Sequence, residues 1–273
     1  MGKLYLVATP IGNLEDITLR ALRVLREVGL IAAEDTRVTR KLLAHYGIDT
    51  PLISYHEHNK LARLDQLFAA LEAGDVALVS DAGTPGLNDP GYELVRAAIA
   101  RGVWVVPVPG PSAPLAALVV SGLPSDSFVY LGYTPRQRSQ RQAFWAGVAG
   151  EARTLIALEA PHRLRACLDD ALHALGDREI AVARELTKLH EEIFRGTISA
   201  ALAHFVEPRG EVTLVVAGAP KGGARWAEDA VREALEAAIR AGASPAQAAK
   251  EVAAASGWSR REVYRLTLAG DAG

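Results

Sequence analysis

The sequence predicts an α/β fold in which a domain with a parallel sheet precedes a domain with a mixed sheet, and a small helical unit follows both. Three observations support this prediction. The 273 residues are enough for two domains. Apolar, strand-like runs alternate with amphipathic segments through the first half of the chain. Three of these runs end in loops that are rich in glycine and proline.

The first domain is predicted to span residues 1–122. Its alternating strands and helices with short connections indicate a parallel sheet, since parallel strands need a crossover between them. We expect strands at Leu4–Thr9, Leu30–Ala33, Pro51–Ser54, Val76–Ser80 and Val103–Val108, and helices at Leu19–Val28, Thr36–His45, Lys60–Glu72 and Tyr92–Arg101. A fifth helix is expected from about Pro111, whose ring suits a first helical turn, to about Ser121.

The second domain is predicted to span residues 123–220, because the segment from Gly122 to Ser125 breaks the alternation. We expect strands at Phe128–Tyr133, Thr154–Glu159, Glu179–Arg184, Glu192–Gly196 and Val212–Ala217, and a helix at Ser199–Val206. The two strands that flank residues 184–193 are adjacent in sequence, which implies antiparallel pairing. The second sheet is therefore predicted to be mixed.

The third unit is predicted to span residues 224–273, after a glycine-rich linker. Three short helices are expected at Ala227–Ala241, Pro245–Ala255 and Arg260–Leu268, with Ser244 and Ser259 as N-caps of the last two. The last two helices and the turn at Gly257 are typical of a helix-turn-helix. From Ala227 to the end, seven acidic residues face six basic ones, which argues against strong binding to phosphates.

Composition excludes several classes of protein. No apolar run is long enough to span a bilayer, and the first residues lack the layout of a signal peptide. With Cys167 as the single cysteine, we expect no disulfide and a cytoplasmic location. The net charge of −2 does not indicate a nucleic-acid binder, although Arg136, Arg138 and Arg141 form a local basic cluster.

The common nucleotide and metal signatures are absent from the sequence. Gly12 is the single glycine of the first loop, so no G-x-G-x-x-G motif follows the first strand, and no G-x-x-x-x-G-K-[ST] loop exists. His56-Glu57-His58 lacks the spacing of a zinc-binding H-E-x-x-H helix. We therefore expect no bound metal.

The three glycine- and proline-rich loops are predicted to form one small-molecule site. They begin at Thr9, Ser80 and Pro109, each directly after an apolar run. Open α/β sheets bind ligands at the carboxyl ends of their strands. Asp81 can accept hydrogen bonds from a ligand, while Thr84 and Ser112 offer small hydroxyl groups.

The motifs in these loops resemble, in their joint order, those of the tetrapyrrole-methylase superfamily. The motifs that carry the resemblance are Thr9–Leu14, Glu34–Arg37, Tyr55–Asn59, Ser80–Gly86, Pro109–Ala113, Glu159–Arg163 and Arg184–Lys188. The likeness covers essentially the whole chain. It is strongest to those members that methylate the ribose 2′-oxygen of a cytidine in the decoding centre of 16S rRNA.

The resemblance implies a two-domain enzyme that binds S-adenosylmethionine between its domains, releases S-adenosylhomocysteine and works as a homodimer on the small ribosomal subunit. The implied cofactor residues are Pro10, Gly12, Asp81, Ala82, Gly83, Thr84, Pro85, Ser112, Ala113, Leu131, Glu159, Ala160, Pro161 and Leu186. The implied RNA-binding residues are Arg37, His58, Asn59, Arg136, Arg138 and Arg163.

Several alternatives stay open at the level of sequence. A ribose hydroxyl attacks faster when a base removes its proton, and His56, Glu57, Glu185 and Lys188 are all candidates for that base. A buried lysine can titrate low enough to serve. A small-molecule methylase of the same fold, or a ligand-sensing DNA-binding regulator with a helix-turn-helix, would also fit the pattern. The basic cluster favours the RNA methyltransferase over the small-molecule enzyme, and the acidic tail argues against the regulator.

Overall fold

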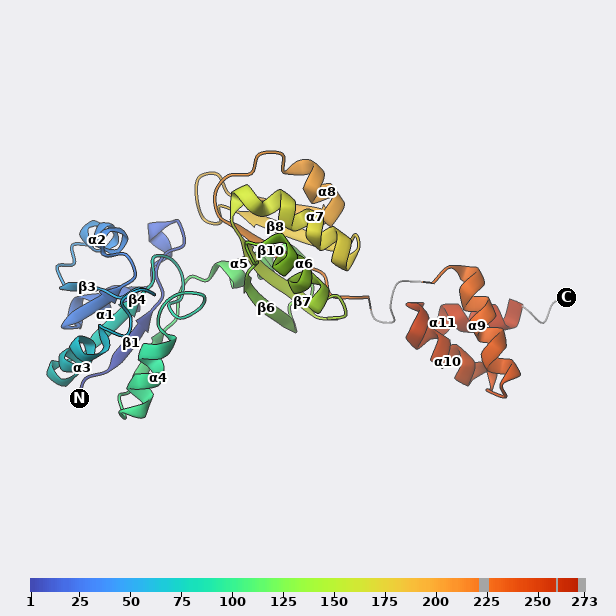
Figure 1. Ribbon diagram of the computed structural model, residues 1–273, viewed down its shortest axis with the longest axis horizontal. Coiled ribbons are helices and arrows are strands. Elements are labelled where there is room, and N and C mark those ends of the chain that lie inside the picture. The colour runs from blue at the N-terminus through green and yellow to red at the C-terminus, as the bar shows by residue number, and fades with distance from the viewer. Residues whose placement is uncertain (221–225, 259, 270–273) are drawn as a thin grey trace.

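A computed structural model describes residues 1–220, 226–258 and 260–269. Two five-stranded sheets lie side by side, and three further helices form a separate group beyond the second sheet (Figure 1). Within the described residues, no helix combines the length and the apolar character that crossing a membrane requires.

The first sheet is entirely parallel, as predicted. Its strands are β1 (Leu4–Val7), β2 (Leu30–Ala33), β3 (Leu52–Ser54), β4 (Val76–Val79) and β5 (Val105–Val108), in the order β3-β2-β4-β1-β5. All residues of β4 are buried, as expected of a central parallel strand with both faces covered. The three strands that precede the glycine- and proline-rich loops, β4, β1 and β5, are neighbours. The loops therefore meet at one edge of the sheet.

Helices cover both faces of this sheet. The helices are α1 (Leu19–Glu27), α2 (Thr36–His45), α3 (Leu64–Ala73) and α4 (Tyr92–Ala100), with the 3-10 turn η1 (Leu14–Asp16) before α1. Leu25 and Leu43 of α1 and α2 belong to one buried cluster, whereas Leu67 and Leu94 of α3 and α4 belong to another. The predicted start of α3 at Lys60 was wrong, because residues 57–63 form turns.

Helix α5 (Ala113–Ser121) connects the two sheets and packs on the second one. The prediction that Pro111 occupies its first turn was wrong. The helix begins at Ala113, and Pro114 lies in the first turn, where a missing N–H costs little. Pro111 stays in the loop, and its carbonyl accepts a hydrogen bond from Thr84 Oγ1 at 3.3 Å.

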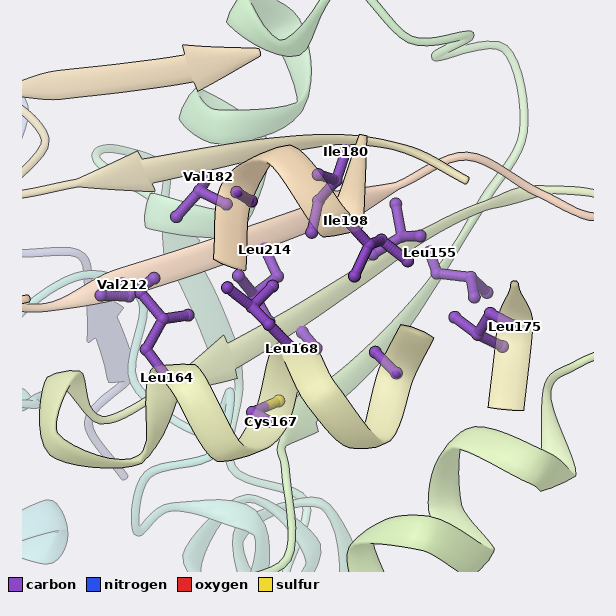
Figure 2. Close-up of a cluster of buried hydrophobic side chains, with 14 of the residues drawn as sticks. Leu155, Leu164, Cys167, Leu168, Leu175, Ile180, Val182, Ile198, Val212 and Leu214 are labelled. Atoms are coloured by element: carbon purple, nitrogen blue, oxygen red, sulfur yellow. The ribbon is translucent and has the colours of Figure 1, made fainter. Parts of the chain in front are cut away.

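The second sheet is mixed, as predicted. Its strands are β6 (Phe128–Tyr133), β7 (Thr154–Glu159), β8 (Glu179–Arg184), β9 (Glu192–Thr197) and β10 (Val212–Val216), in the order β6-β7-β10-β8-β9. Only the β6–β7 pair is parallel among these. Helices α6 (Arg138–Gly147), α7 (Leu164–Leu175) and α8 (Ile198–His204) enclose the main core of this sheet, with η2 (Pro161–Arg163) before α7. Leu164, Cys167 and Leu168 of α7 lie among the buried side chains of this core (Figure 2).

Arg141 belongs to the interior and not to the exposed basic cluster that the sequence indicates. It is 4% exposed, and its guanidinium donates to Asp170 Oδ2 with Nε at 2.8 Å and Nη2 at 2.7 Å. Gln142 also donates to the same carboxylate. A buried charge is tolerated when its partner satisfies it in this way. Arg141 therefore ties α6 to α7.

The helical unit consists of α9 (Glu228–Arg240), α10 (Pro245–Ser256) and α11 (Arg260–Ala269), which share a small apolar core. The Ser244 cap is confirmed, because its hydroxyl accepts a hydrogen bond from the Gln247 N–H. Ser259, the other predicted cap, lies outside the described residues. The division of the chain at residues 122 and 220 stays a prediction.

Candidate functional site

The cleft between the two sheets holds two adjoining cavities. The first, of about 260 Å³, is lined by Ile11, Ala82, Gly83, Thr84, Leu87, Asn88, Asp89, Ser112, Ala113, Pro114, Tyr130, Tyr133, Leu158, Glu159, Ala160, Pro161, Glu211, Val212 and Thr213. The second, of about 470 Å³, is lined by Thr9, Pro10, Ile11, Gly12, Leu14, Val38, Thr39, Lys41, Leu42, Ser80, Asp81, Ala82, Lys188 and Glu211. Ile11, Ala82 and Glu211 border both cavities.

The loops after β1, β4 and β5 hold one another in place, which defines the first-sheet wall of both cavities. Thr9 and Gly83 exchange backbone hydrogen bonds of 2.9 and 3.0 Å between the first two loops. Gly83 adopts a φ of +79°, a conformation that glycine reaches without steric cost. The Thr84 hydroxyl extends this linkage to the third loop through Pro111.

Two contacts bring the second sheet against the first, and each of them is made at a glycine. The aliphatic chain of Lys188 lies over Gly12, where an added Cβ would sit 2.3 Å from Lys188 Cγ. On the other side, the amide of Asn88 lies against Gly132, where a Cβ would sit 2.5 Å from Nδ2. Asn13 N–H also donates to Thr187 Oγ1 at 3.2 Å. These close approaches bring the two sheets together around the cavities.

Lys188 is held in a network of opposite charges. Its Nζ lies 2.9 Å from Glu185 Oε1 and 3.1 Å from Glu211 Oε2. Burial acts to lower the pKa of Lys188, but the hydrogen bonds to the two glutamates outweigh it and raise the pKa. The same hydrogen bond lowers the pKa of Glu185. At neutral pH the lysine is charged and the glutamate is a weak base, so this geometry supports neither as the general base.

Carboxylates gather on the first-sheet side of the cleft. Burial raises the pKa of Asp89, and the charge of Asp81 adds to this effect. Burial also raises the pKa of Asp81, whose Oδ1 accepts a 2.9 Å hydrogen bond from Asp35 N–H. Glu34 shows a raised pKa too, mainly through burial and then through Asp89. In the described part of the chain, these carboxylates do not form a group that could ligate a metal.

The structure brings most of the predicted cofactor residues to the cleft. Ala82, Gly83, Thr84, Ser112, Ala113, Glu159, Ala160 and Pro161 line the first cavity, and Pro10, Gly12 and Asp81 line the second. Leu186 lines a small pocket of about 20 Å³ that also borders Ile11 and Glu211. Pro85 and Leu131 line none of these cavities.

The two remaining candidates for the base lie elsewhere. His56 and Glu57 follow β3 and line neither cavity. His56 Nε2 lies 3.2 Å from Asn59 Nδ2, while its buried Nδ1 has no partner within the described residues. Glu57 pairs with Lys60 at 2.7 Å. The His58 ring lies against that of His56.

The predicted RNA-binding arginines differ in their exposure. Arg136 is exposed, and the side chain of Arg138 is 72% exposed. The side chain of Arg37 is 84% exposed, although it pairs with Asp35 at 2.6 Å. Arg163, in contrast, is 16% exposed and pairs with the buried Glu159 at 2.5 Å. Arg163 therefore supports the wall of the first cavity and has little reach toward solvent.

Sequence reasoning missed several lining residues. Tyr130 and Tyr133 of β6 and Val212 and Thr213 at the start of β10 come from strands whose sequences carry no ligand signature. Asn88 and Asp89 precede Pro90, and this turn signal was available in the sequence. The Tyr130 hydroxyl is buried and has no hydrogen-bond partner in the described chain. A buried unpartnered hydroxyl at a cavity wall is suited to a ligand.

Comparisons with known proteins identify the class. The family described as Tetrapyrrole (Corrin/Porphyrin) Methylases matches residues 3–202. The chain therefore belongs to this methylase family, as its motifs predict. Uroporphyrin-III-C-methyltransferase from Thermus thermophilus has a similar structure, with a TM-score of 0.59 and 25% identity over 80% of this chain and 94% of that one. A diphthine synthase reaches a TM-score of 0.60 at 15% identity over 80% and 91% of the two chains, which confirms the fold.

Two relatives within the family are similar to the chain over nearly its full length. Ribosomal RNA small subunit methyltransferase I of Synechocystis sp. is 50% identical over 273 residues, which cover 98% of each chain. The protein of the same name from Bacillus subtilis is 45% identical, over 97% of this chain and 93% of its own.

The contact of Lys188 with Gly12 gives a testable prediction. Gly12→Ala places a methyl group on the lysine stem, so we expect it to reduce the free energy of unfolding by about 1–3 kcal/mol. Lys188→Ala removes the obstructing stem. In urea denaturation, the double variant should therefore be more stable than the sum of the single effects by about 1 kcal/mol. Strictly additive effects would show that the two residues do not touch.

Proposed function

We propose that this chain methylates the ribose 2′-oxygen of a cytidine in the decoding centre of 16S rRNA, with S-adenosylmethionine as the methyl donor. The observation that carries the proposal is the 50% identity with a ribosomal RNA small subunit methyltransferase I over 98% of both chains. The similar small-molecule methylase is only 25% identical, which makes that alternative weaker. The proposed setting is the cytoplasm, with the small ribosomal subunit as substrate and a homodimer as the working form.

The lining of the first cavity offers groups that suit the proposed cofactor. Ile11, Leu158 and Val212 offer an apolar surface for the adenine ring. The unpartnered Tyr130 hydroxyl offers a hydrogen bond to a polar group inside the cavity. Asp89 offers a carboxylate to a cation. S-adenosylmethionine combines these three features, because it carries an aromatic base, ribose hydroxyls and a positive charge.

The residues of the chain would mainly position the reactants. When bound, S-adenosylmethionine supplies an electrophilic methyl group and leaves as S-adenosylhomocysteine. Orientation accounts for a large part of the catalysis of such a transfer. The loops that Thr9, Gly83 and Thr84 link would hold the donor, while Asn88 against Gly132 would keep water out. Asp81, Asp89 and Glu211 line the cavities, so these carboxylates are better placed to accept a proton than His56 or Glu57, which line neither.

The proposed RNA contacts lie outside the cleft. Arg37, Arg136 and Arg138 are exposed and can approach phosphates. His58 and Asn59 stay in the proposal as part of the segment after β3. Arg163 is not part of the proposal, because its side chain is only 16% exposed and pairs with a buried glutamate, Glu159.

The proposed activity is tested on small ribosomal subunits from cells that lack the corresponding gene. Incubation with the purified chain and S-adenosylmethionine should produce 2′-O-methylcytidine in 16S rRNA, detected by nuclease digestion and mass spectrometry. Large ribosomal subunits serve as the control and should stay unmodified. A methyl group on the base, or no methylation of the small subunit, would disprove the proposal.

The raised pKa of Asp89 predicts how cofactor binding depends on pH. The ionised carboxylate attracts the cationic donor, so affinity should stay constant above this pKa and fall as the pH drops through it. Asp89→Asn should weaken binding about tenfold at pH 7, the loss of one charge-assisted hydrogen bond, and should remove the decrease in acid.

Calorimetry between pH 7 and about pH 4.5 measures both effects, with Asp65→Asn on the exposed surface of α3 as the matched control. This control should bind like the wild type at every pH. Equal affinity and an equal pH profile for Asp89→Asn would place the cationic part of the cofactor away from this carboxylate.

A further inference from the structure

The second cavity remains after the cofactor has been assigned to the first. Its volume of about 470 Å³ falls within the range of ligand-binding pockets. Helix α2 forms its outer wall through Val38, Thr39, Lys41 and Leu42. The loops after β1 and β4 and the side chain of Lys188 complete it. Because both cavities share Ile11, Ala82 and Glu211, a ligand in the second cavity would touch the contents of the first.

The walls of the second cavity carry three kinds of group. Leu14, Val38 and Leu42 give it an apolar side. Asp81 and Glu211 place hydrogen-bond acceptors near the shared border. Lys41 lines the second cavity and not the first, is exposed, and makes no ion pair with any described residue. This lysine is therefore a free cation of the cavity, as far as the described residues go, and its exposed position defines what we call the outer end of the cavity.

We propose that the second cavity receives the single nucleotide whose ribose is methylated, an assignment that rests on the proposed function. The base lies against the apolar side, and the ribose hydroxyls donate to Asp81 and Glu211 at the shared border. The phosphate lies at the outer end beside Lys41. Enzymes that do chemistry on a base take the nucleotide out of its stack into such a pocket, and the same arrangement would present the ribose to the donor.

This arrangement also gives a role to the network around Lys188. Glu185 and Glu211 hold the ammonium group at the wall of the cavity, and Gly12 leaves room for its stem. The fixed charge offsets the acidic groups nearby, so an anionic nucleotide meets a less negative wall. In this proposal Lys188 is a positioning residue, because it holds Glu211, which accepts a hydrogen bond from the ribose.

A substitution that fills the second cavity tests the proposal. Val38 is 40% exposed on α2, so Val38→Trp can add bulk to the cavity without entering the core. Ile99→Trp, at an exposed position on α4, is the matched control. We expect Val38→Trp to bind S-adenosylhomocysteine within twofold of wild type and to lose at least 100-fold in kcat/KM on small subunits. The control should keep both properties.

Two results would overturn the assignment. Methylation by Val38→Trp within threefold of wild type would show that the cavity is not used. Loss of S-adenosylhomocysteine binding in this variant would place the cofactor in the second cavity. Saturation-transfer NMR with cytidine 5′-monophosphate measures binding of the nucleotide directly and does not depend on methylation. The nucleotide should bind the S-adenosylhomocysteine-loaded wild type and not loaded Val38→Trp, even if the proposed activity itself were absent.

A charge substitution tests the outer end. Lys41→Met should raise KM for small subunits about tenfold and leave kcat within twofold, since the phosphate contact forms on binding and does not change in the transition state. Arg40→Met removes a charge from the neighbouring exposed position of α2, which does not line the cavity, and should change KM less than threefold. Equal effects of the two substitutions would overturn the phosphate position.

Discussion

The close approach of the two sheets at Gly12 and Gly132 is the constraint on which the rest of the site depends. The stem of Lys188 lies over the first glycine and the amide of Asn88 against the second, and a side chain at either position would displace the side chain that contacts it. Both cavities take lining residues from the two sides that meet there. Glu211 from the second sheet reaches the border that the cavities share. The closure therefore sets where a donor and an acceptor can meet.

The charges of the molecule are separated in a way that suits two different ligands. Carboxylates with raised pKa values, among them Asp81 and Asp89, gather on the first-sheet side of the cleft, where a cationic donor would benefit from them. Exposed arginines such as Arg136 and Arg138 lie outside it, where an anionic RNA would approach. The net charge of −2 hides this separation. This separation of charges explains how a weakly acidic protein can present a basic surface to RNA, its proposed substrate.

Both sheets and the meeting of the three loops could be predicted from the sequence, because strand periodicity and glycine–proline punctuation are local signals. What the sequence could not supply depends on distant partners. From the sequence, Arg141 is predicted to be part of an exposed basic cluster. In the structure it forms a buried ion pair with Asp170, which lies on another helix. Lys188 appears as a possible base until its ion pairs are seen, one with Glu185 and one with the distant Glu211 directly before β10, which together raise its pKa. The lining residues of β6 and β10 sit in ordinary apolar strands, so only the fold reveals them.

The central claim is that the donor occupies the first cavity and leaves the second free for the acceptor. A crystal structure of the chain with S-adenosylhomocysteine tests this directly. We predict density for the adenosyl group between Thr84, Ser112 and Glu159, with the sulfur directed toward the shared border at Ala82 and Glu211. Density for the adenosyl group beside Val38 and Lys41 would contradict the account.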